Sequence, residues 1–236
     1  MVKVFETYDH YEREMANLLM LQQNYKNRDA AMVSCIEGQD DSTLALILTP
    51  LCQPRDQRLH TISMNDIRQL VNFVDECAHI GLVHYDLRPN NIMIENDTSK
   101  ICIIDWVYCF KIESELADQF GGTLRNAAPE VLKFVENRQI QSFARLTVSP
   151  THALHSIVRY IYGLINTADQ EKLNALECRR DSNGKIDSKY FRKIEHFWAR
   201  SFDTPFWRGI LKCVDQLDYN GIITGFIHVL PGSASE

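Results

Sequence analysis

The segment LVHYDLRPNNIMI, residues 82–94, constrains the fold of this chain more than any other stretch. It places a histidine, an aspartate, an arginine, a proline and two asparagines between apolar runs. Before it, Ser63 and Asp66 form a capping-box signature that opens a helix, and Gly81 ends that helix. After it, NIMIE and KICIIDW flank the turn NDTS and predict a β-hairpin. A dense polar turn is costly unless its groups find partners or ligands, so this pattern indicates a site.

The rest of the chain divides into a strand-rich part and a mostly helical part. MVKVF alternates as a strand does, and AAMVSCI and TLALILTPL predict two more strands separated by the polar loop EGQDDS. TYDHYEREMANLLMLQQ predicts a helix after the first strand. One stripe of this helix is expected to contain Tyr8, Tyr11, Met15, Leu18 and Gln22. Residues 108–128 are expected to be irregular, and from Pro150 onward every strong pattern is helical.

Composition and charge exclude several classes of protein. At 236 residues and 45% apolar, the chain is long enough for one large domain or two lobes with a core. Its 25 basic and 31 acidic residues give a net charge of −6, which argues against a broad nucleic-acid or membrane surface but not against a local basic pocket. The seven cysteines contain no CxxC pair, so neither a disulfide framework nor a zinc site is expected.

The same sequence predicts where the protein resides. The N-terminus is charged from its third residue and lacks the apolar region of a secretory leader. No later apolar run reaches the roughly 18 residues of a membrane span. We therefore expect an intracellular protein, cytoplasmic or nuclear, with no membrane and no nucleic-acid partner.

Three motifs, in matching order and spacing, resemble those of the protein kinases. HYDLRPNN resembles the catalytic loop H-R-D-L-x-x-x-N, and IIDW resembles the metal-binding D-F-G segment. GGTLRNAAPEVL resembles the end of a kinase activation segment, where A-P-E corresponds to residues 128–130. The resemblance implies a two-lobe α+β fold. Residues 1–51 would form a truncated N-lobe of about three strands and one helix, residues 52–230 a mainly helical C-lobe, and residues 231–236 a tail.

The resemblance also assigns roles in phosphoryl transfer to the catalytic loop and the metal segment. Such a reaction needs an oriented nucleophile and cations that neutralise the developing charge on the phosphoryl oxygens. Asp86 would orient a substrate hydroxyl or accept its proton, and Arg88 would face the transferred phosphate. Asn91 and Asp105 would hold one or two Mg²⁺ ions that bridge the phosphates of ATP.

The first strand and helix acquire nucleotide-binding roles from the same resemblance. VKVF is similar to the kinase strand V-A-I-K, which makes Lys3 the candidate that grips the α- and β-phosphates. Glu14 fits the helix glutamate that pairs with this lysine. Residues 47–51 would form the hinge that lines the adenine pocket, with Thr49 and Leu51 as nucleotide contacts.

Several departures from the kinase pattern bear on activity. No G-x-G-x-x-G occurs in the sequence, and the arginine beside the catalytic aspartate is Tyr85, which removes the usual docking point of an activation-loop phosphate. Val107 replaces the glycine of D-F-G, so this segment is not expected to flip between states. Ala153 stands where kinases brace the catalytic loop with an acidic residue. Glu130 is expected to pair with an arginine near the C-terminus, either Arg200 or Arg208.

Three interpretations remain open. The first is a kinase that transfers the γ-phosphate of Mg-ATP to a Ser or Thr hydroxyl of a protein. The second is a pseudokinase that acts as a protein-binding module, which the missing Gly-rich loop favours. The third is a small-molecule kinase of the aminoglycoside or choline type, because IIDW also resembles their metal segment, although GTLRNAAPE argues against it. The chain is further expected to be a fragment, a natural truncation or one piece completed by a partner.

Overall fold

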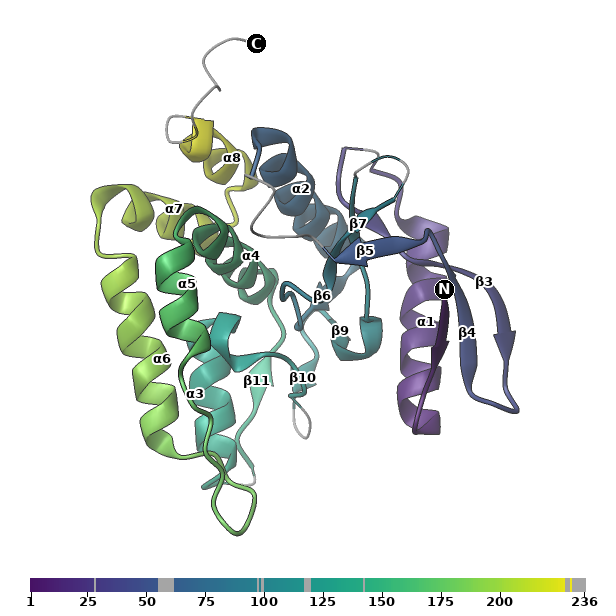
Figure 1. Ribbon diagram of the computed structural model, residues 1–236, viewed down its shortest axis with the longest axis horizontal. Coiled ribbons are helices and arrows are strands. Elements are labelled where there is room, and N and C mark those ends of the chain that lie inside the picture. The colour runs from purple at the N-terminus through teal and green to yellow at the C-terminus, as the bar shows by residue number, and fades with distance from the viewer. Residues whose placement is uncertain are drawn as a thin grey trace.

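The computed structural model describes the chain over residues 1–27, 29–54, 62–96, 98, 100–116, 120–141, 143–227 and 230. The tail predicted for residues 231–236 lies outside these described residues. Most of the helices gather in one part of the molecule, and the longer strands lie beside the first helix in the other part (Figure 1). The fold is therefore α+β with two unequal parts, as predicted.

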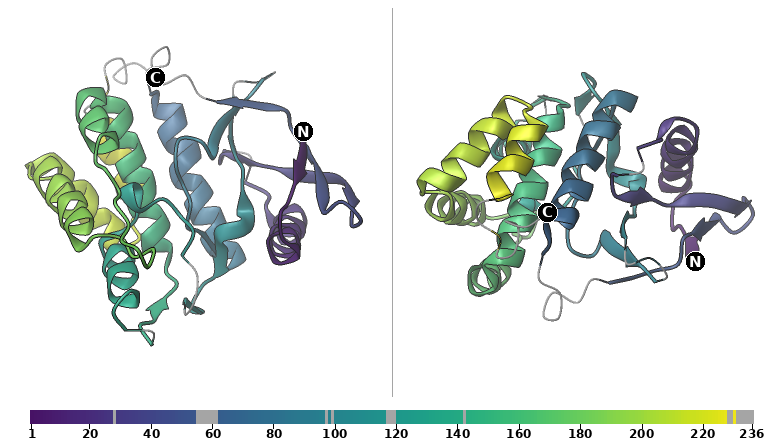
Figure 2. Two further views of the ribbon diagram at one scale, coloured as in Figure 1. Left: turned by 60° about the horizontal axis from the view of Figure 1, so that its bottom comes forward. Right: turned by 90° about the horizontal axis from the view of Figure 1, so that it is seen from above.

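The smaller part is an antiparallel sheet with one helix beside it. The strands β1 (Val2–Val4), β4 (Ala45–Thr49) and β3 (Cys35–Asp40) pair in the order β1-β4-β3, and α1 (Tyr8–Asn24) lies next to them (Figure 2). Along β4 the buried Leu46 and Leu48 alternate with the exposed Ile47. Successive side chains of a strand point to opposite faces, so this sheet has one buried face and one solvent face.

Tertiary pairing changed two of the predicted strands. AAMVSCI divides at Ser34, because β2 (Met32–Val33) pairs in parallel with β8 (Ile101–Ile103) whereas β3 pairs with β4. The smaller part thus keeps the three paired strands β1, β4 and β3, as predicted, whereas β2 joins the sheet beside the polar segment. The first four residues of EGQDDS, predicted as a loop, extend β3 to Asp40, because β3 is an edge strand whose polar side chains face solvent, while Asp41 and Ser42 lie in the turn before β4.

The helix before the polar segment begins and ends where the sequence predicted. In α2 (Met64–Ile80) the Ser63 hydroxyl accepts a hydrogen bond from the Asp66 N–H at 3.1 Å, and the Asp66 carboxylate accepts one from the Ser63 N–H at 2.8 Å. Gly81 has φ 86°, the left-handed conformation in which glycine ends a helix. The chain then enters β6 (Leu82–His84) at a defined angle.

Short strands surround the polar segment on both sides. β7 (Ile92–Glu95) and β8 form the predicted hairpin within a sheet of order β2-β8-β7-β5, where β5 is Cys52–Pro54. β6 pairs with β9 (Cys109–Lys111), so part of the segment predicted to be irregular is a strand. This pairing returns the chain to the polar segment just after the predicted metal-binding aspartate.

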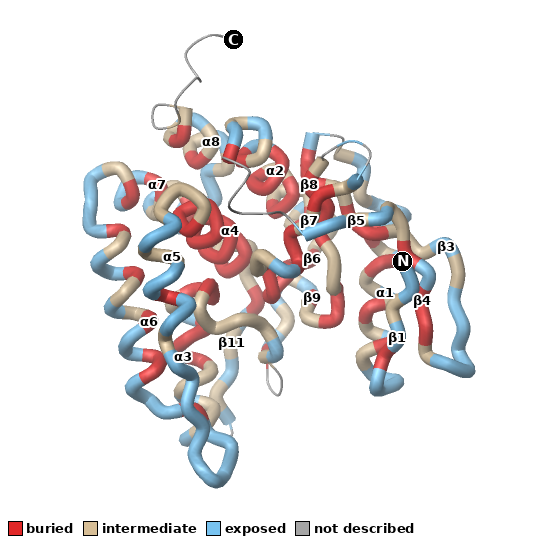
Figure 3. The backbone as a smooth tube through the Cα atoms, in the orientation of Figure 1, coloured by how far each residue is buried: buried red, intermediate tan, exposed pale blue. Residues whose placement is uncertain are grey.

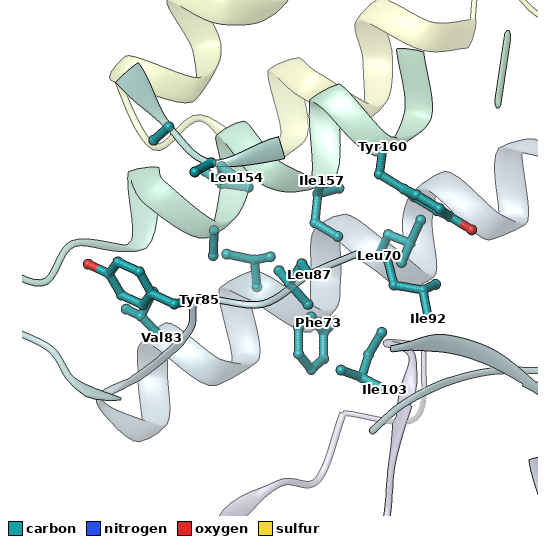
Figure 4. Close-up of a cluster of buried hydrophobic side chains, with 14 of the residues drawn as sticks. Leu70, Phe73, Val83, Tyr85, Leu87, Ile92, Ile103, Leu154, Ile157 and Tyr160 are labelled. Atoms are coloured by element: carbon teal, nitrogen blue, oxygen red, sulfur yellow. The ribbon is translucent and has the colours of Figure 1, made fainter. Parts of the chain in front are cut away.

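The larger part is built around one buried helix. In α4 (Pro150–Ile165) every residue from His152 to Gly163 is buried, as the continuous red of its tube shows (Figure 3). Leu87 of the polar segment packs with Leu70 and Phe73 of α2 and with Ile157 of α4 in one hydrophobic cluster (Figure 4). Packing of Leu87 into this cluster fixes the backbone of the polar segment. No helix in the described part of the chain is both long and apolar enough to cross a membrane.

Shorter elements complete the larger part. The remaining elements are η1 (Trp106–Tyr108), β10 (Glu115–Leu116), η2 (Leu124–Asn126), α3 (Pro129–Arg138), β11 (Leu146–Thr147), α5 (Thr167–Asn174), α6 (Ser188–Ser201), α7 (Pro205–Asp215) and α8 (Tyr219–Ile227). Thr204 caps α7 by accepting the N–H of Trp207, and Pro205 occupies its first turn.

A buried histidine of α4 predicts that the protein loses stability in mild acid. Burial and the charge of Arg159 lower the pKa of His155 from 6.5 to about 3. The Asp215 carboxylate, 3.5 Å from His155 Nε2, is 69% exposed, so solvent screens its opposing effect. The unfolded chain takes up a proton below pH 6.5 that the folded chain refuses, so stability falls as the pH drops from about 6.5 towards 3.

The expected loss at pH 4.5 relative to pH 7.5 is about 2 to 3 kcal/mol from this histidine. Burial also lowers the pKa of His84 and of His152, which act in the same direction. Urea unfolding at several pH values measures the effect. The slope of the unfolding free energy against pH should become shallower in His155→Gln. An unchanged slope in that variant would contradict the assignment.

Candidate active site

The Lys3 ammonium group lies between two carboxylates. It forms an ion pair with Glu14 and donates a hydrogen bond to Asp105 Oδ1 at 2.9 Å. β1 supplies the lysine and α1 supplies the glutamate, so the two elements meet across the inner face of the sheet. Burial raises the pKa of the fully buried Glu14 carboxyl group, and the positive charge of Lys3 opposes that rise.

The inner face of α1 is rotated by about one residue from the predicted stripe, with which it shares Tyr11 and Leu18. Its buried residues are Tyr11, Glu14, Leu18 and Leu21. Tyr8 and Gln22, predicted on the stripe, are exposed. The buried face is centred on Glu14, whose charge is stabilised by an ion pair with Lys3 that no apolar periodicity could indicate.

Asp105 follows β8 in an unusual backbone conformation. Its φ of 68° lies in the left-handed region, which aspartate and asparagine tolerate better than most side chains. The next residue, Trp106, is completely buried, and its indole N–H donates to the Ile103 carbonyl at 3.3 Å. The Asn17 amide donates to the Trp106 carbonyl at 2.8 Å. Asp105 is thus held by anchors on β8 and α1.

Two aromatic contacts complete the anchoring of Trp106. Its ring meets His84 edge-on with centroids 4.8 Å apart and Phe73 with centroids 5.8 Å apart. Edge-on aromatic pairs of this kind stabilise beyond the burial of their area. His84 therefore packs directly against the segment that carries Asp105. A histidine from the catalytic loop and a phenylalanine from α2 therefore lock the segment that carries Asp105.

Both oxygens of the buried Asp86 carboxylate are engaged. Oδ1 accepts a hydrogen bond from the Thr123 N–H at 2.9 Å, and Oδ2 accepts one from the Asn91 amide at 2.8 Å. Arg88 Nε lies 3.0 Å from Oδ2 as an ion pair. The structure thus brings Asp86, Arg88 and Asn91 together in the loop between β6 and β7. It also joins this loop to the activation segment through Thr123.

A second set of hydrogen bonds joins the catalytic loop to the segment of Asp105. The Asp86 N–H donates to His84 Nδ1 at 3.1 Å, and His84 Nε2 lies 3.3 Å from the Ile104 carbonyl. Because Nδ1 accepts, Nε2 carries the proton, and burial lowers the pKa of His84 in favour of this neutral form. The Ile104 N–H donates back to the Asn91 carbonyl at 3.0 Å. Ile104 immediately precedes Asp105, so one hydrogen-bond framework holds both the catalytic loop and Asp105.

The two predicted hinge residues lie apart from these charged groups. Thr49 ends β4 opposite Cys35, and Leu51 follows it with 61% of its surface exposed. The Leu51 carbonyl accepts a hydrogen bond from the Asn96 N–H at 3.3 Å. Among the described residues, neither side chain forms a hydrogen bond with Lys3 or Asp105. They occupy the connection between β4 and β5, so a role for them in nucleotide binding stays a prediction.

The donor atoms at the site suit a hard divalent cation. Asp105 offers a carboxylate and Asn91 an amide oxygen, which are the ligand types that Mg²⁺ prefers, and bound phosphates would complete such a set. Across the described residues no group of three or more His, Cys, Asp or Glu side chains is placed to hold a metal ion. A metal ion here would therefore need the nucleotide as well as the protein.

The sequence interpretation missed His152 as the brace of the catalytic loop. The Tyr85 hydroxyl lies 2.5 Å from His152 Nδ1, and the Tyr85 ring meets Phe110 and Phe120 edge-on. Burial lowers the pKa of His152, so the neutral imidazole accepts the hydroxyl proton. His152 lies one residue before Ala153, the position at which kinases brace the catalytic loop with an acidic residue. Only the pair of residues reveals it, because neither the tyrosine nor the histidine alone signals such a contact.

The expected partner of Glu130 is also different. Within the described residues Glu130 forms no ion pair with Arg200 or Arg208, and Arg208 pairs with Asp203 instead. The buried Arg159 of α4 lies beneath this region and donates to the Ala127 carbonyl. Glu130 itself is exposed, and its negative charge opposes the lowering of the Arg159 pKa that burial causes.

Comparison with known proteins decides the family of the chain. The family model described as the protein kinase domain matches residues 8–144, a range that contains the catalytic loop, Asp105 and most of the activation segment. The chain belongs to the protein kinase family. The motifs that suggested this family are therefore the family's own.

Two kinds of relative accompany the family match. Sperm motility kinases 3A and 2A of Mus musculus are 41% and 38% identical to this kinase over 66 residues, which are 28% of this chain and 13% of each relative. The matched segment thus spans a small part of their length. The solved structure of the kinase PK-1 of Cydia pomonella granulovirus has a TM-score of 0.63 at 11% identity, covering 95% of this chain and 83% of that one. That similarity concerns the fold alone.

Proposed function

We propose that this kinase transfers the γ-phosphate of Mg-ATP to a serine or threonine hydroxyl of a protein. The observation that carries the proposal is the shared framework of the site. Hydrogen bonds through His84 and Ile104 hold Asp86, Asn91 and Asp105 in fixed relation, and Lys3 joins Glu14 to Asp105. Preorganised charge of this kind is the main requirement of phosphoryl transfer.

Asp86 is placed to receive the substrate hydroxyl. A carboxylate offers about four acceptor positions: the N–H groups of Thr123 and Asn91 use two of them, and the Arg88 ion pair covers a third without a hydrogen bond. The remaining position accepts the proton of the hydroxyl as it attacks. Arg88 is 38% exposed beyond its contact with Asp86, so the outer edge of its guanidinium group is open to a phosphate.

The remaining charged residues are assigned to the nucleotide. Lys3, with three N–H donors, would contact the α- and β-phosphates while it retains its ion pair with Glu14. Asn91 and Asp105 would hold Mg²⁺, which neutralises charge on the phosphates when Mg-ATP is bound. We place Thr49 and Leu51 at the adenine, and we assign residues 1–51 to the N-lobe and 52–230 to the C-lobe.

Binding of Mg-ATP provides the direct test of the site. At about 100 times its Kd, a ligand stabilises a folded protein by roughly 2.7 kcal/mol, which raises Tm by about 5 to 10 °C for a chain of this size. We expect that rise with ATP and Mg²⁺, and little of it with EDTA. Asp105→Asn should lose the magnesium-dependent part, because asparagine tolerates the same backbone conformation but lacks the charge.

Asp203→Asn is the matched control for this experiment. It makes the same chemical change at an exposed residue that pairs with Arg208 on the helical side of the molecule. The control should keep the full shift in Tm. An equal shift in Asp105→Asn and in the unmodified protein would remove Asp105 from the metal site.

A pseudokinase is the second candidate, and one observation favours it. The 236 residues contain no G-x-G-x-x-G, so the backbone N–H groups that this loop places over the phosphates in other kinases are missing from the sequence. Stabilisation by Mg-ATP without transfer to any serine or threonine peptide would support this candidate. Transfer that needs Asp86 would exclude it.

A further inference from the structure

A cationic cavity of about 300 Å³ opens beside the activation segment. It lies between α3 and the loop 179–187 that precedes α6. The residues that matter for its chemistry are Phe120, Phe134, Arg138, Arg180, Lys185 and Ile186. We name it the cationic pocket. Three of these residues carry a positive charge, and among the described residues that line the pocket none is acidic.

The charge of the cationic pocket is opposite in sign to the net charge of the whole chain. The kinase carries a net charge of −6, yet the pocket gathers three cations. The nearby Asp181 accepts the backbone N–H groups of Asn183 and Lys185 at 2.8 and 2.9 Å, so it shapes the loop. Arg180 and Lys185 also border Glu136, Asp181 and Asp187 on the adjoining surface, so the positive charge is confined to the pocket itself. Cations lining a pocket attract an acidic ligand and repel a basic one.

The walls of the pocket are held by specific hydrogen bonds. The Gln139 side chain bonds both backbone groups of Ile186, accepting its N–H at 2.5 Å and donating to its carbonyl at 3.3 Å. Arg180 Nη1 donates to the Gly184 carbonyl at 2.8 Å within the loop. The loop is therefore docked on the end of α3, and its charged side chains project from a fixed backbone.

The pocket lies close to the catalytic aspartate along the chain. Phe120, which lines it, precedes Thr123 by three residues, and the Thr123 N–H contacts Asp86. Between them Gly122 lies so near the catalytic loop that a Cβ there would stand 2.4 Å from the Tyr85 carbonyl oxygen. Three residues span at most about 11 Å. The Phe120 wall of the pocket is therefore within reach of an extended substrate whose hydroxyl lies at Asp86 and whose next residues span about three positions.

We propose that the cationic pocket binds an aspartate or glutamate side chain of the protein substrate, about three residues from the phosphorylated hydroxyl. The proposal rests on the proposed phosphotransfer and adds its substrate class. Arg180 and Lys185 supply the charge, and the rings of Phe120 and Phe134 flank the stem of the acidic side chain. This selection would favour acidic substrates over neutral ones of equal length.

Peptide binding measured without ATP tests the pocket separately from catalysis. Two fluorescent peptides carry one serine, with glutamate at the third position on both sides in the first and glutamine there in the second. We expect the full chain to bind the glutamate peptide roughly tenfold more tightly at low salt, as judged by fluorescence anisotropy. That preference should shrink as salt screens the charges.

Charge reversal at Lys185 is the decisive variant. Lys185→Glu should weaken binding of the glutamate peptide by roughly fivefold or more and leave the glutamine peptide unaffected. Lys185 is exposed, so the change leaves the core intact, and circular dichroism verifies the fold. Lys212→Glu makes the same change on α7, outside the pocket, and should keep the preference. Arg180→Gln should act as Lys185→Glu does, to a smaller extent.

The possible results distinguish failure of the pocket proposal from failure of the proposed phosphotransfer. A glutamate preference that depends on Lys185, without any phosphate transfer, would support the pocket and reject only the phosphotransfer. Equal affinity for the two peptides would overturn the pocket proposal. Equal losses in Lys185→Glu and Lys212→Glu would overturn it too, because the effect would then be one of net charge. Tight binding of a phosphoserine peptide alone would overturn the assignment to aspartate or glutamate.

Discussion

Replacing Asp86 by asparagine is expected to lower the rate of phosphate transfer by about 10²- to 10⁴-fold while Mg-ATP still binds. The amide lacks the acceptor position that takes the proton of the substrate hydroxyl. It also presents an N–H group to either Thr123 or Asn91, which both already donate to this carboxylate. Transfer of labelled phosphate to a serine peptide measures the first effect, and the Mg-ATP shift in Tm verifies that the nucleotide site is retained.

The buried position of Asp86 calls for a control on stability. One buried donor left without an acceptor costs about 1 to 3 kcal/mol, so part of the effect of Asp86→Asn will be lower stability. Tyr85→Phe is the matched variant, because it removes the hydrogen bond to His152 from the adjacent residue and leaves the carboxylate in place. It should lose comparable stability yet retain transfer. Full activity in Asp86→Asn would refute the role of this residue.

The largest effect on stability is expected at Trp106. Trp106→Ala should lower the free energy of unfolding by about 3 to 5 kcal/mol, a large share of the roughly 5 to 15 kcal/mol of a typical domain. The variant empties a completely buried site between His84 and Phe73 and removes the hydrogen bond to Ile103. Urea unfolding followed by circular dichroism measures the change.

Trp106→Phe separates the loss of the indole N–H from the loss of the aromatic ring. Phenylalanine keeps the edge-on aromatic contacts but lacks the indole N–H, so its cost should be clearly smaller than that of alanine. Because Asp105 adjoins this anchor, Trp106→Ala should also reduce the Mg-ATP shift at temperatures where the protein stays folded. Equal stability of the alanine variant and the unmodified protein would show that the anchor is unimportant.

Local chemistry made much of the fold predictable. The capping box at Ser63 and the helix end at Gly81 depend on residues a few positions apart, and the structure confirms both. The kinase motifs were equally visible, because catalytic residues need definite side chains at definite spacing. The strand AAMVSCI was predicted as one element since its division depends on partners in β4 and β8, which local alternation does not reveal.

The sequence by itself determined the helix before the catalytic loop, its caps, the hairpin after it and the identity of the catalytic loop, because these depend on neighbours along the chain. Only the tertiary structure decided which residues brace the loop and where charge collects. The contact of Tyr85 with His152 joins positions 67 residues apart, and the cationic pocket joins the activation segment, α3 and the loop before α6. Such contacts depend on how the elements pack, which no local pattern encodes.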